Sequence, residues 1–328
     1  MALAFAAAAL FSHYLTPVLR QAAIRFGIVD RPDGRLKNHR APVPYLGGIA
    51  IYLSFLLSLA LTAEFERDVL GILLSGAIVV ILGLIDDLGA LSPSVKLAGQ
   101  VVAVLALMKA SVTIKLAFLP PALALPLSFL WLLAVTNAFN LIDIMDGLAA
   151  GVGLVTAIVL TCVAAGSGRH MIALLLAALS GSLAGFLRYN FEPARIYMGD
   201  AGSLFLGLML GALAMNNSYT TKNLVASLSP VVILGVPIFD MLFVMVIRWR
   251  RGIPIMRGSP DHFALRLRKW RLTTRQTVWT SCFAAALLGA VGIAMMLTPA
   301  RAAAGILAAT LVVALGLGIY LKKIEMTL

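Results

Sequence analysis

The stretch VLGILLSGAIVVILGLIDDLGALSP, residues 69–93, decides the fold class, because an uncharged apolar run ends there on two adjacent carboxylates, Asp86 and Asp87. A helix needs about 20 mostly apolar residues to cross a bilayer. A charge at the bilayer centre costs roughly 3 kcal/mol or more, and two neighbouring charges also repel. We therefore expect the pair to lie at the membrane edge, or to be compensated by a cation.

The composition extends this interpretation to the whole chain. Of the 328 residues, 61% are hydrophobic and 12% are charged, and the mean hydropathy is +0.98. A soluble domain is about half apolar and a quarter charged. The sequence therefore predicts an all-α, polytopic membrane protein with about eleven spans and one transmembrane catalytic domain over residues 1–328. The expected spans are residues 2–19, 46–63, 69–85, 95–110, 124–142, 147–166, 170–187, 201–216, 224–247, 278–297 and 302–321.

Basic residues divide unequally between the two sides of this arrangement. The odd-numbered connections and the C-terminal tail carry 20 of the 26 Lys and Arg residues, most of them in loops 20–45 and 248–277. The positive-inside rule places these loops in the cytoplasm and the N-terminus outside. The positive charge points to membrane lipid headgroups as partners, and we expect no nucleic acid.

A second polar cluster lies in TNAFNLIDIMDGLAAG, residues 136–151. Asn137, Asn140 and Asp143 are three residues apart and should share one helix face, which Asp146 continues before the helix ends. Hydrogen bonds between spans would also explain polar residues here. Two acids make that alternative weaker, since neither could remain ionised in apolar surroundings without a partner.

Three further motifs are expected on the same side. Asp200, in RIYMGDAGSLFLG (195–207), opens an apolar helix and is either a ligand or a helix N-cap. The basic segment RWRRGIPIMRGSPDHFALRLRKWRLT (248–273) could bind lipid headgroups or substrate phosphates. HRAPVPYLGG (39–48) is either a turn before a helix or part of the site.

Together these motifs bring acids from three spans to one membrane face. Converging carboxylates suit a hard cation with oxygen ligands, and Mg²⁺ is typically held by few carboxylates and completed by substrate phosphates. The sequence therefore predicts a metal–phosphate site at the cytoplasmic edge. The residues that converge there are Asp86, Asp87, Asn140, Asp143, Asp146 and Asp200.

At this point the motifs resemble a known family. GLIDDLGALSP, NAFNLIDIMDGLA, MGDAGSLFLG and GIPIMRGSPDH, with KNHRAPVPYLGG before them, are similar to the polyprenyl-phosphate N-acetylhexosamine-1-phosphate transferases. The resemblance implies transfer of a HexNAc phosphate from a UDP-sugar to undecaprenyl phosphate, with release of UMP. This would be the first membrane step of a cell-envelope glycan such as lipopolysaccharide or cell-wall polymer, in the inner (cytoplasmic) membrane.

The resemblance also implies roles for single residues. It assigns Mg²⁺, or Mn²⁺ as the alternative ion, to Asp200, and it implies that the span containing Pro237 is bent beside a lipid groove. Arg266 and Arg268 stand near His262, where relatives carry several histidines. The implied catalytic residues are Asp86, Asp87, Asn140, Asp143 and Asp146, and the implied substrate-binding residues are Lys37, His39, Asp261, His262, Arg266 and Arg268.

Several alternatives remain open from the sequence. Within the family, the UDP-N-acetylhexosamine branch is favoured over the branch that transfers muramyl-pentapeptide. A secondary transporter would place its acids near the bilayer midplane, and a CDP-alcohol phosphotransferase would need an arginine that DGLAAG lacks. Whether the protein forms a homodimer is not decided by the sequence.

Overall fold

The computed structural model describes residues 1–30, 42–64, 67–89, 91–116, 118–220, 222–254 and 259–326 of the chain. These are 77% helical and form 13 α-helices, so the all-α expectation is confirmed. A short antiparallel pair, β1 (Val29–Asp30) and β2 (Val43–Pro44), is the exception. The helices are α1 (Ala2–Arg25), α2 (Gly47–Thr62), α3 (Arg67–Asp87), α4 (Pro93–Lys109), α5 (Pro121–Ile142), α6 (Leu148–Gly166), α7 (His170–Asn190), α8 (Gly199–Met215), the single-turn η1 (Val225–Leu228), α9 (Ser229–Ile233), α10 (Gly235–Arg250), α11 (Phe263–Lys269), α12 (Thr274–Leu297) and α13 (Ala300–Lys322).

Every segment that the sequence predicts as a span is helical, but the helices differ in length. Among the described residues, seven helices are long and apolar enough to cross a membrane, or eight if the bent pair of η1–α9 and α10 counts as one span. Helices α2, α4 and α8 have 16, 17 and 17 residues. The chain is therefore a multi-pass membrane protein.

The ninth predicted segment, 224–247, is broken. Val225–Ile233 and Gly235–Arg250 meet at an angle of 77°. Pro237 explains the position of the break, because proline has no N–H to donate to the carbonyl four residues earlier and its ring clashes with that carbonyl, here on Ile233. The chain bends next to Ile233, at Leu234, rather than at the proline itself.

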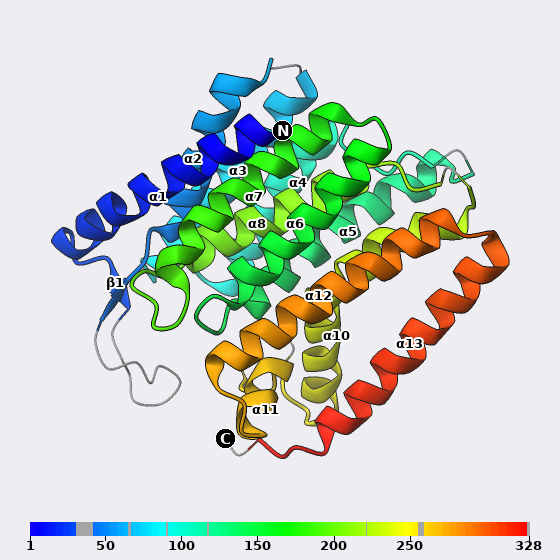
Figure 1. Ribbon diagram of the computed structural model, residues 1–328. Coiled ribbons are helices and arrows are strands. Elements are labelled where there is room, and N and C mark those ends of the chain that lie inside the picture. Colours follow the sequence, from blue (N-terminus) through cyan, green and yellow to red (C-terminus); the bar gives the residue numbers. More distant parts are fainter. Residues whose placement is uncertain are drawn as a thin grey trace.

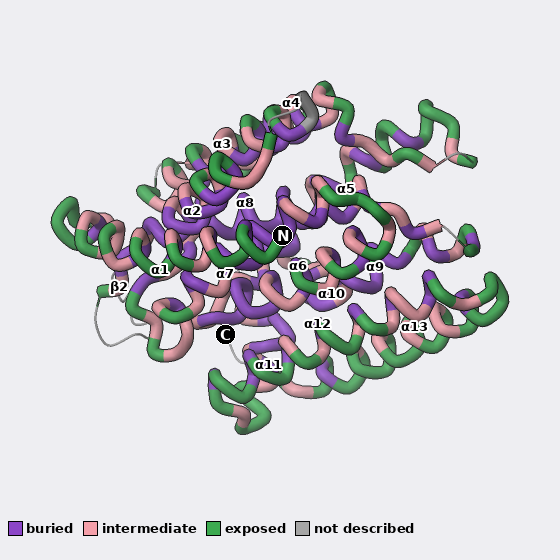
Figure 2. Tube along the Cα trace, turned by 45° about the horizontal axis from the view of Figure 1, so that its top comes forward, coloured by how far each residue is buried: buried purple, intermediate pink, exposed green. Residues whose placement is uncertain are grey.

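Helix α8 lies at the centre of the bundle. Every residue from Ala201 to Ala214 is buried, and α2, α3, α5, α6 and α7 pack around it. In Figure 2 its trace is buried along its length, whereas the outer helices show one exposed side. A helix that is apolar on every side can lie in a protein core or face lipid, and the burial of α8 places it in the protein core.

Close contact between α3 and α8 fixes the position of the paired aspartates. A Cβ atom added at Gly83 would lie 2.3 Å from the backbone nitrogen of Ala201, so only glycine permits this approach. Gly83 lies one helical turn before Asp87, and Ala201 lies in the first turn of α8. The contact therefore brings the end of α3 against the beginning of α8.

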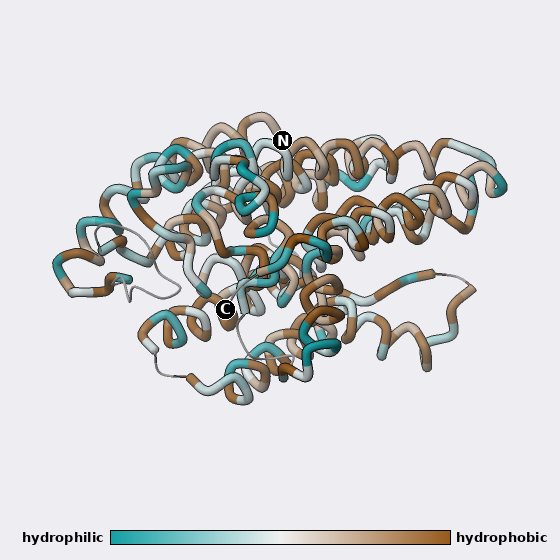
Figure 3. The backbone as a smooth tube through the Cα atoms, turned by 90° about the horizontal axis from the view of Figure 1, so that it is seen from below, coloured by the Kyte–Doolittle hydropathy of each residue, from teal (hydrophilic) through white to brown (hydrophobic). Residues whose placement is uncertain are grey.

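Helices α12 and α13 lie at one edge of the molecule (Figure 1). Only 6% of the most apolar window of α13 is buried within the protein. Long hydrophobic stretches run along the helices in Figure 3, as expected for surfaces that face lipid. Helix α12 begins with a capping box between Thr273 and Gln276, which fixes the start of α12 beside the site described next.

Candidate active site

One cavity of about 770 Å³ lies where several helices end. It is bounded by the ends of α3, α5, α7 and α10, the starts of α8 and α12, and the segments between them. Its volume is within the range of about 300–1,000 Å³ that is usual for small-molecule sites. The charged and ionisable residues on its wall are Asp30, Tyr45, Asp87, Asp143, Asp146, Glu192, Tyr197, Asp200, Arg248, His262 and Arg268.

Asp87 anchors the beginning of α8. Its Oδ1 accepts a hydrogen bond from the Asp200 N–H at 2.7 Å, and its Oδ2 accepts one from the Ala201 N–H at 3.2 Å. The first N–H groups of a helix have no partner inside the helix, and the positive end of the helix dipole favours a carboxylate there. Gly199 has φ +70°, and a Cβ on it would lie 2.5 Å from Asp87 Oδ2, so glycine is required at this turn.

Lys96 connects the remaining polar groups. Its Nζ lies 2.9 Å from Asp86 Oδ2, 2.9 Å from Asp200 Oδ2 and 3.2 Å from Asn140 Oδ1. Asn140 Nδ2 in turn donates to Asp200 Oδ1 and, at 2.9 Å, to Ser203 Oγ. The ammonium group of Lys96 thus compensates the two carboxylates at the ends of α3 and α8.

This arrangement excludes Asp200 as the N-cap of α8, which was one of the two roles that the sequence left open. The residue lies in the first turn of α8, and the N-cap position is held by Met198. Its carboxylate instead faces Lys96 and Asn140 and lines the cavity. Asp86 lies behind the wall, since it contacts Lys96 but is not among the lining residues.

Asp143 and Asp146 reach the cavity from a turn. Helix α5 ends at Ile142, so Asp143 is its C-cap and Asp146 is not on the helix face that the spacing of three predicts. Asp146 Oδ2 accepts a hydrogen bond from the Ala194 N–H at 2.8 Å. Burial, together with the charges of Asp200, Asp87 and Asp146, raises the pKa of Asp143 to about 8. Asn137 faces Gln100 instead, with Nδ2 to Oε1 at 2.6 Å.

The late loop divides into residues that face the cavity and residues that face the protein. His262 and Arg268 line the cavity. The His262 ring is held by Asp240 of α10, with Nδ1 and Oδ2 2.6 Å apart, and the Phe263 N–H donates to the other oxygen of Asp240 at 2.9 Å. On the same wall, Arg248 Nε donates to Ser259 Oγ at 2.9 Å.

Asp261 and Arg266, both predicted to bind substrate, are not among the residues that line the cavity. Arg266 Nη2 pairs with Asp261 Oδ1 at 2.9 Å, and Arg266 Nη1 donates to the carbonyls of Leu321 and Ile324 near the C-terminus. Both side chains are almost completely buried. Residues two positions apart on a helix point about 200° apart, so Arg268 faces the cavity because Arg266 faces inward.

The sequence did not indicate several residues of this site. The motifs include neither Lys96, within the predicted span 95–110, nor Asp240, within the predicted span 224–247. Their signal was the ionisable side chain itself, since such groups inside membrane segments are expected to have partners. Lys37 and His39, both predicted to bind substrate, lie outside the described residues.

The carboxylates fit a site for Mg²⁺. No group of three His, Cys, Asp or Glu side chains is arranged as a metal site in the part of the chain that the structure describes. Mg²⁺ does not need one, because it commonly keeps several waters and uses one or two carboxylates together with substrate phosphates. Asp200 and Asp143 present such oxygens to the cavity. A cation there would also reduce the repulsion that raises the pKa of Asp143.

The chain is similar in sequence to several known proteins. Residues 69–218 match the family described as Glycosyl transferase family 4. The chain is 35% identical to a probable undecaprenyl-phosphate N-acetylglucosaminyl 1-phosphate transferase of Bacillus subtilis (strain 168), over 80% of this chain and 76% of that protein. It is 31% identical to the decaprenyl-phosphate N-acetylglucosaminephosphotransferase of Mycobacterium tuberculosis (strain ATCC 25618 / H37Rv), over 81% and 74%. A match of lower significance is a phospho-N-acetylmuramoyl-pentapeptide-transferase of Desulforudis audaxviator (strain MP104C), 32% identical over 82% and 90%.

Proposed function

We propose that this chain, which belongs to the polyprenyl-phosphate N-acetylhexosamine-1-phosphate transferases, transfers N-acetylglucosamine 1-phosphate from UDP-N-acetylglucosamine to undecaprenyl phosphate. The observation that carries the proposal is the cavity itself. Carboxylates of α3, α8 and the 143–146 turn lie on its wall together with Arg248, His262 and Arg268. A diphosphate and a cation need these two kinds of group side by side.

In the proposed reaction, an oxygen of the lipid phosphate attacks the β-phosphorus of the UDP-sugar. A new P–O bond forms as the bond from that phosphorus to the α–β bridging oxygen breaks, and UMP leaves with the electron pair. The lipid phosphate is largely ionised near neutral pH, so no strong base is required. Such a transfer depends mainly on positioning and on neutralising charge.

The residues can be assigned to these tasks. Asp200 and Asp143 would hold Mg²⁺, or Mn²⁺ as the alternative, and the bound ion would neutralise the diphosphate as the bridging bond breaks. Lys96, with Asp86 behind it, fixes the carboxylate of Asp200. The lysine also limits the repulsion between the two carboxylates.

The other residues position the sugar nucleotide and the walls around it. Asp87 holds α8 against α3, and Asp146 ties the 143–146 turn to the segment before α8. Arg268 and His262 lie where they could contact phosphate oxygens of the UDP-sugar. An arginine is suited to this task because its fork holds two oxygens and its charge is permanent.

We also propose the orientation of the protein in the membrane. The cavity lies at the ends of helices whose connections carry most of the basic residues, which supports a cytoplasmic active site and an external N-terminus in the inner membrane. Cysteines introduced into residues 118–123 should then react with an impermeant reagent from outside. Cysteines at residues 252–254 should react only after the membrane is opened, and the opposite result would refute the orientation.

The activity itself is tested with purified protein, undecaprenyl phosphate and separate UDP-sugars. We expect UMP release with UDP-N-acetylglucosamine, dependent on both the lipid phosphate and Mg²⁺. UDP-N-acetylmuramyl-pentapeptide is included because one relative is named for that substrate. If that substrate alone released UMP, the chain would belong to the other branch, and no UMP with any UDP-sugar would refute the proposed reaction.

A further inference from the structure

A second pocket, of about 250 Å³, lies at the opposite end of the helices that form the active-site cavity. Val69 near the start of α3 lines this pocket, whereas Asp87 at the end of α3 lines the cavity. At 1.5 Å per residue the two positions are roughly 27 Å apart along the helix axis. Helix α8 likewise carries Met215 at the pocket and Asp200 at the cavity. The two sites therefore lie close to opposite surfaces of the membrane.

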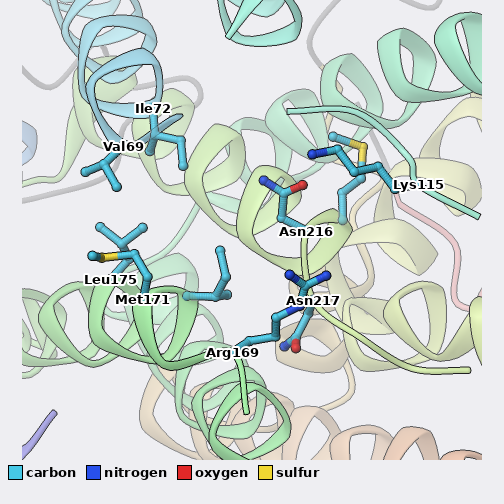
Figure 4. A pocket seen from close by; sticks show the side chains of 10 residues that line it. Val69, Ile72, Lys115, Arg169, Met171, Leu175, Asn216 and Asn217 are labelled. Atoms are coloured by element: carbon cyan, nitrogen blue, oxygen red, sulfur yellow. The ribbon is translucent and has the colours of Figure 1, made fainter. Parts of the chain in front are cut away.

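The pocket has two chemically different sides. Figure 4 shows the apolar side chains of Val69, Ile72, Met171 and Leu175 on one side. Four nitrogen-bearing side chains lie on the other side, with Lys115 and Arg169 reaching in from either side of the amides. These polar residues are Lys115, Arg169, Asn216 and Asn217. The wall is thus suited to a ligand with one polar and one apolar part.

The two cations have no counter-charge in the described structure. None of the residues that line the pocket is acidic. Within the part of the chain that the structure describes, the side chains of Lys115 and Arg169 make no ion pair or hydrogen bond. Asn217 is fixed, since its Nδ2 donates to the Leu160 carbonyl at 3.3 Å and its Oδ1 accepts from the Ser218 N–H at 2.9 Å. Among the described residues, the polar side of the pocket therefore carries the two positive charges of Lys115 and Arg169 without an acid beside them.

The start of α7 adds to this positive potential. Arg169 is the N-cap of α7, and Met171 and Ile172 of its first turn line the pocket. The free N–H groups and the dipole at a helix N-terminus attract anions. The first turn of α7 contains no acid that would neutralise this effect.

We propose that this pocket binds the phosphate of an anionic phospholipid in the leaflet opposite the active site, with Lys115 and Arg169 as the phosphate contacts. The pocket is too small for a nucleotide but has room for a headgroup phosphate. The acyl chains would extend from the apolar side of the pocket, which is formed by Val69, Ile72, Met171 and Leu175 (Figure 4). A free phosphate ion would leave the apolar side of the pocket without a partner. This site is independent of the proposed reaction and of its substrates.

The proposal is tested by lipid binding to the purified, delipidated protein, measured by native mass spectrometry with phosphatidylglycerol. The variant Lys115→Gln/Arg169→Gln removes both charges, and Lys115→Arg/Arg169→Lys keeps them. Lys222→Gln/Arg301→Gln is the matched control, since both residues are exposed basic side chains that do not line the pocket. The midpoint of thermal unfolding checks that each protein is folded.

We expect the charge-removing variant to bind phosphatidylglycerol roughly thirtyfold more weakly. Each basic residue near a membrane typically strengthens the binding of anionic lipid by about 5.4-fold, and the variant removes two such residues. The charge-keeping variant and the matched control should bind as the unmodified protein does. Equal binding by all four proteins would overturn the proposal. Displacement of the lipid by inorganic phosphate at the same concentration would overturn the assignment to a lipid, since the apolar side would then contribute nothing.

Discussion

Replacing Lys96 with glutamine tests the centre of the proposed site. The ammonium group lies 2.9 Å from oxygens of both Asp86 and Asp200, and the side chains of Lys96, Asp86 and Asp200 are 18%, 15% and 30% exposed. Removing one partner of a fully buried pair costs about 3–5 kcal/mol, and an exposed pair contributes about 0–1 kcal/mol. Because Lys96 makes two partly buried contacts, we expect Lys96→Gln to lower the free energy of unfolding by about 3 kcal/mol.

The change should also lower activity. Without Lys96, Asp86 and Asp200 repel each other, and the carboxylate proposed to hold the metal loses its position. We expect UMP release to fall at least tenfold, since small displacements of a catalytic group are costly, and the unfolding midpoint to fall by roughly 5 °C. Lys109→Gln, at the exposed other end of α4, is the matched control and should change neither.

A double variant separates the charge effect from a loss of packing. Adding Asp86→Asn to Lys96→Gln removes the repulsion, so part of the lost stability should return, and the two changes should be non-additive by about 1 kcal/mol or more. The measurements are thermal unfolding in detergent and the rate of UMP release. The reasoning is refuted if Lys96→Gln is as stable and as active as the unmodified protein.

Three other predictions concern the cavity. Asp200→Asn should lower UMP release by two or more orders of magnitude, or about 3 kcal/mol of transition-state stabilisation, with the fold retained in thermal unfolding. The pKa of Asp143 is raised to about 8, and this carboxyl must lose its proton to bind Mg²⁺. The apparent affinity for Mg²⁺ should therefore rise between pH 6.5 and pH 8.5. The variant Asp143→Asn should remove this pH dependence. Arg268→Ala should raise the Michaelis constant for the UDP-sugar with little effect on the lipid substrate, whereas Arg266→Ala should lower the unfolding midpoint.

Each of these three has a result that would contradict it. Near-normal turnover by a stably folded Asp200→Asn protein would exclude the residue as a metal ligand. An Mg²⁺ affinity that does not change with pH in the unmodified protein would remove Asp143 from the metal site. An unchanged UDP-sugar dependence in Arg268→Ala, or a change in Arg266→Ala without loss of stability, would contradict the division of the late loop.

The sequence predicted features that depend on local pattern. Apolar runs between polar connections indicated the helices, because backbone groups in lipid must be satisfied within the segment. The order of the motifs and the alternation of sides predicted that Asp87, Asn140, Asp143 and Asp200 meet, and they line one cavity. Both inferences need only the helix period and the crossing of a membrane.

Features that depend on packing could not be predicted in this way. The role of Lys96 could not be predicted because its partners lie on other helices, α3, α5 and α8. Asp146 left the predicted helix face because α5 ends at Ile142. Arg266 and Arg268 have the same chemistry, and the contacts of Arg266 with Asp261 and with the C-terminal segment decide which one turns inward. For Lys96 and Arg266, partners distant in sequence decide where the side chain lies.

The burial of α8 has a consequence for how the protein is made. Its principal packing neighbours, α2, α3, α5, α6 and α7, all precede it in the chain. A growing chain is synthesised from its N-terminus, so α8 leaves the ribosome when the helices that will surround it already exist. We expect a chain truncated after residue 220 to shield a cysteine in the middle of α8 from a lipid-soluble reagent as well as the full protein does, and strong labelling of that truncated chain would show that α10 to α13 are needed to enclose α8.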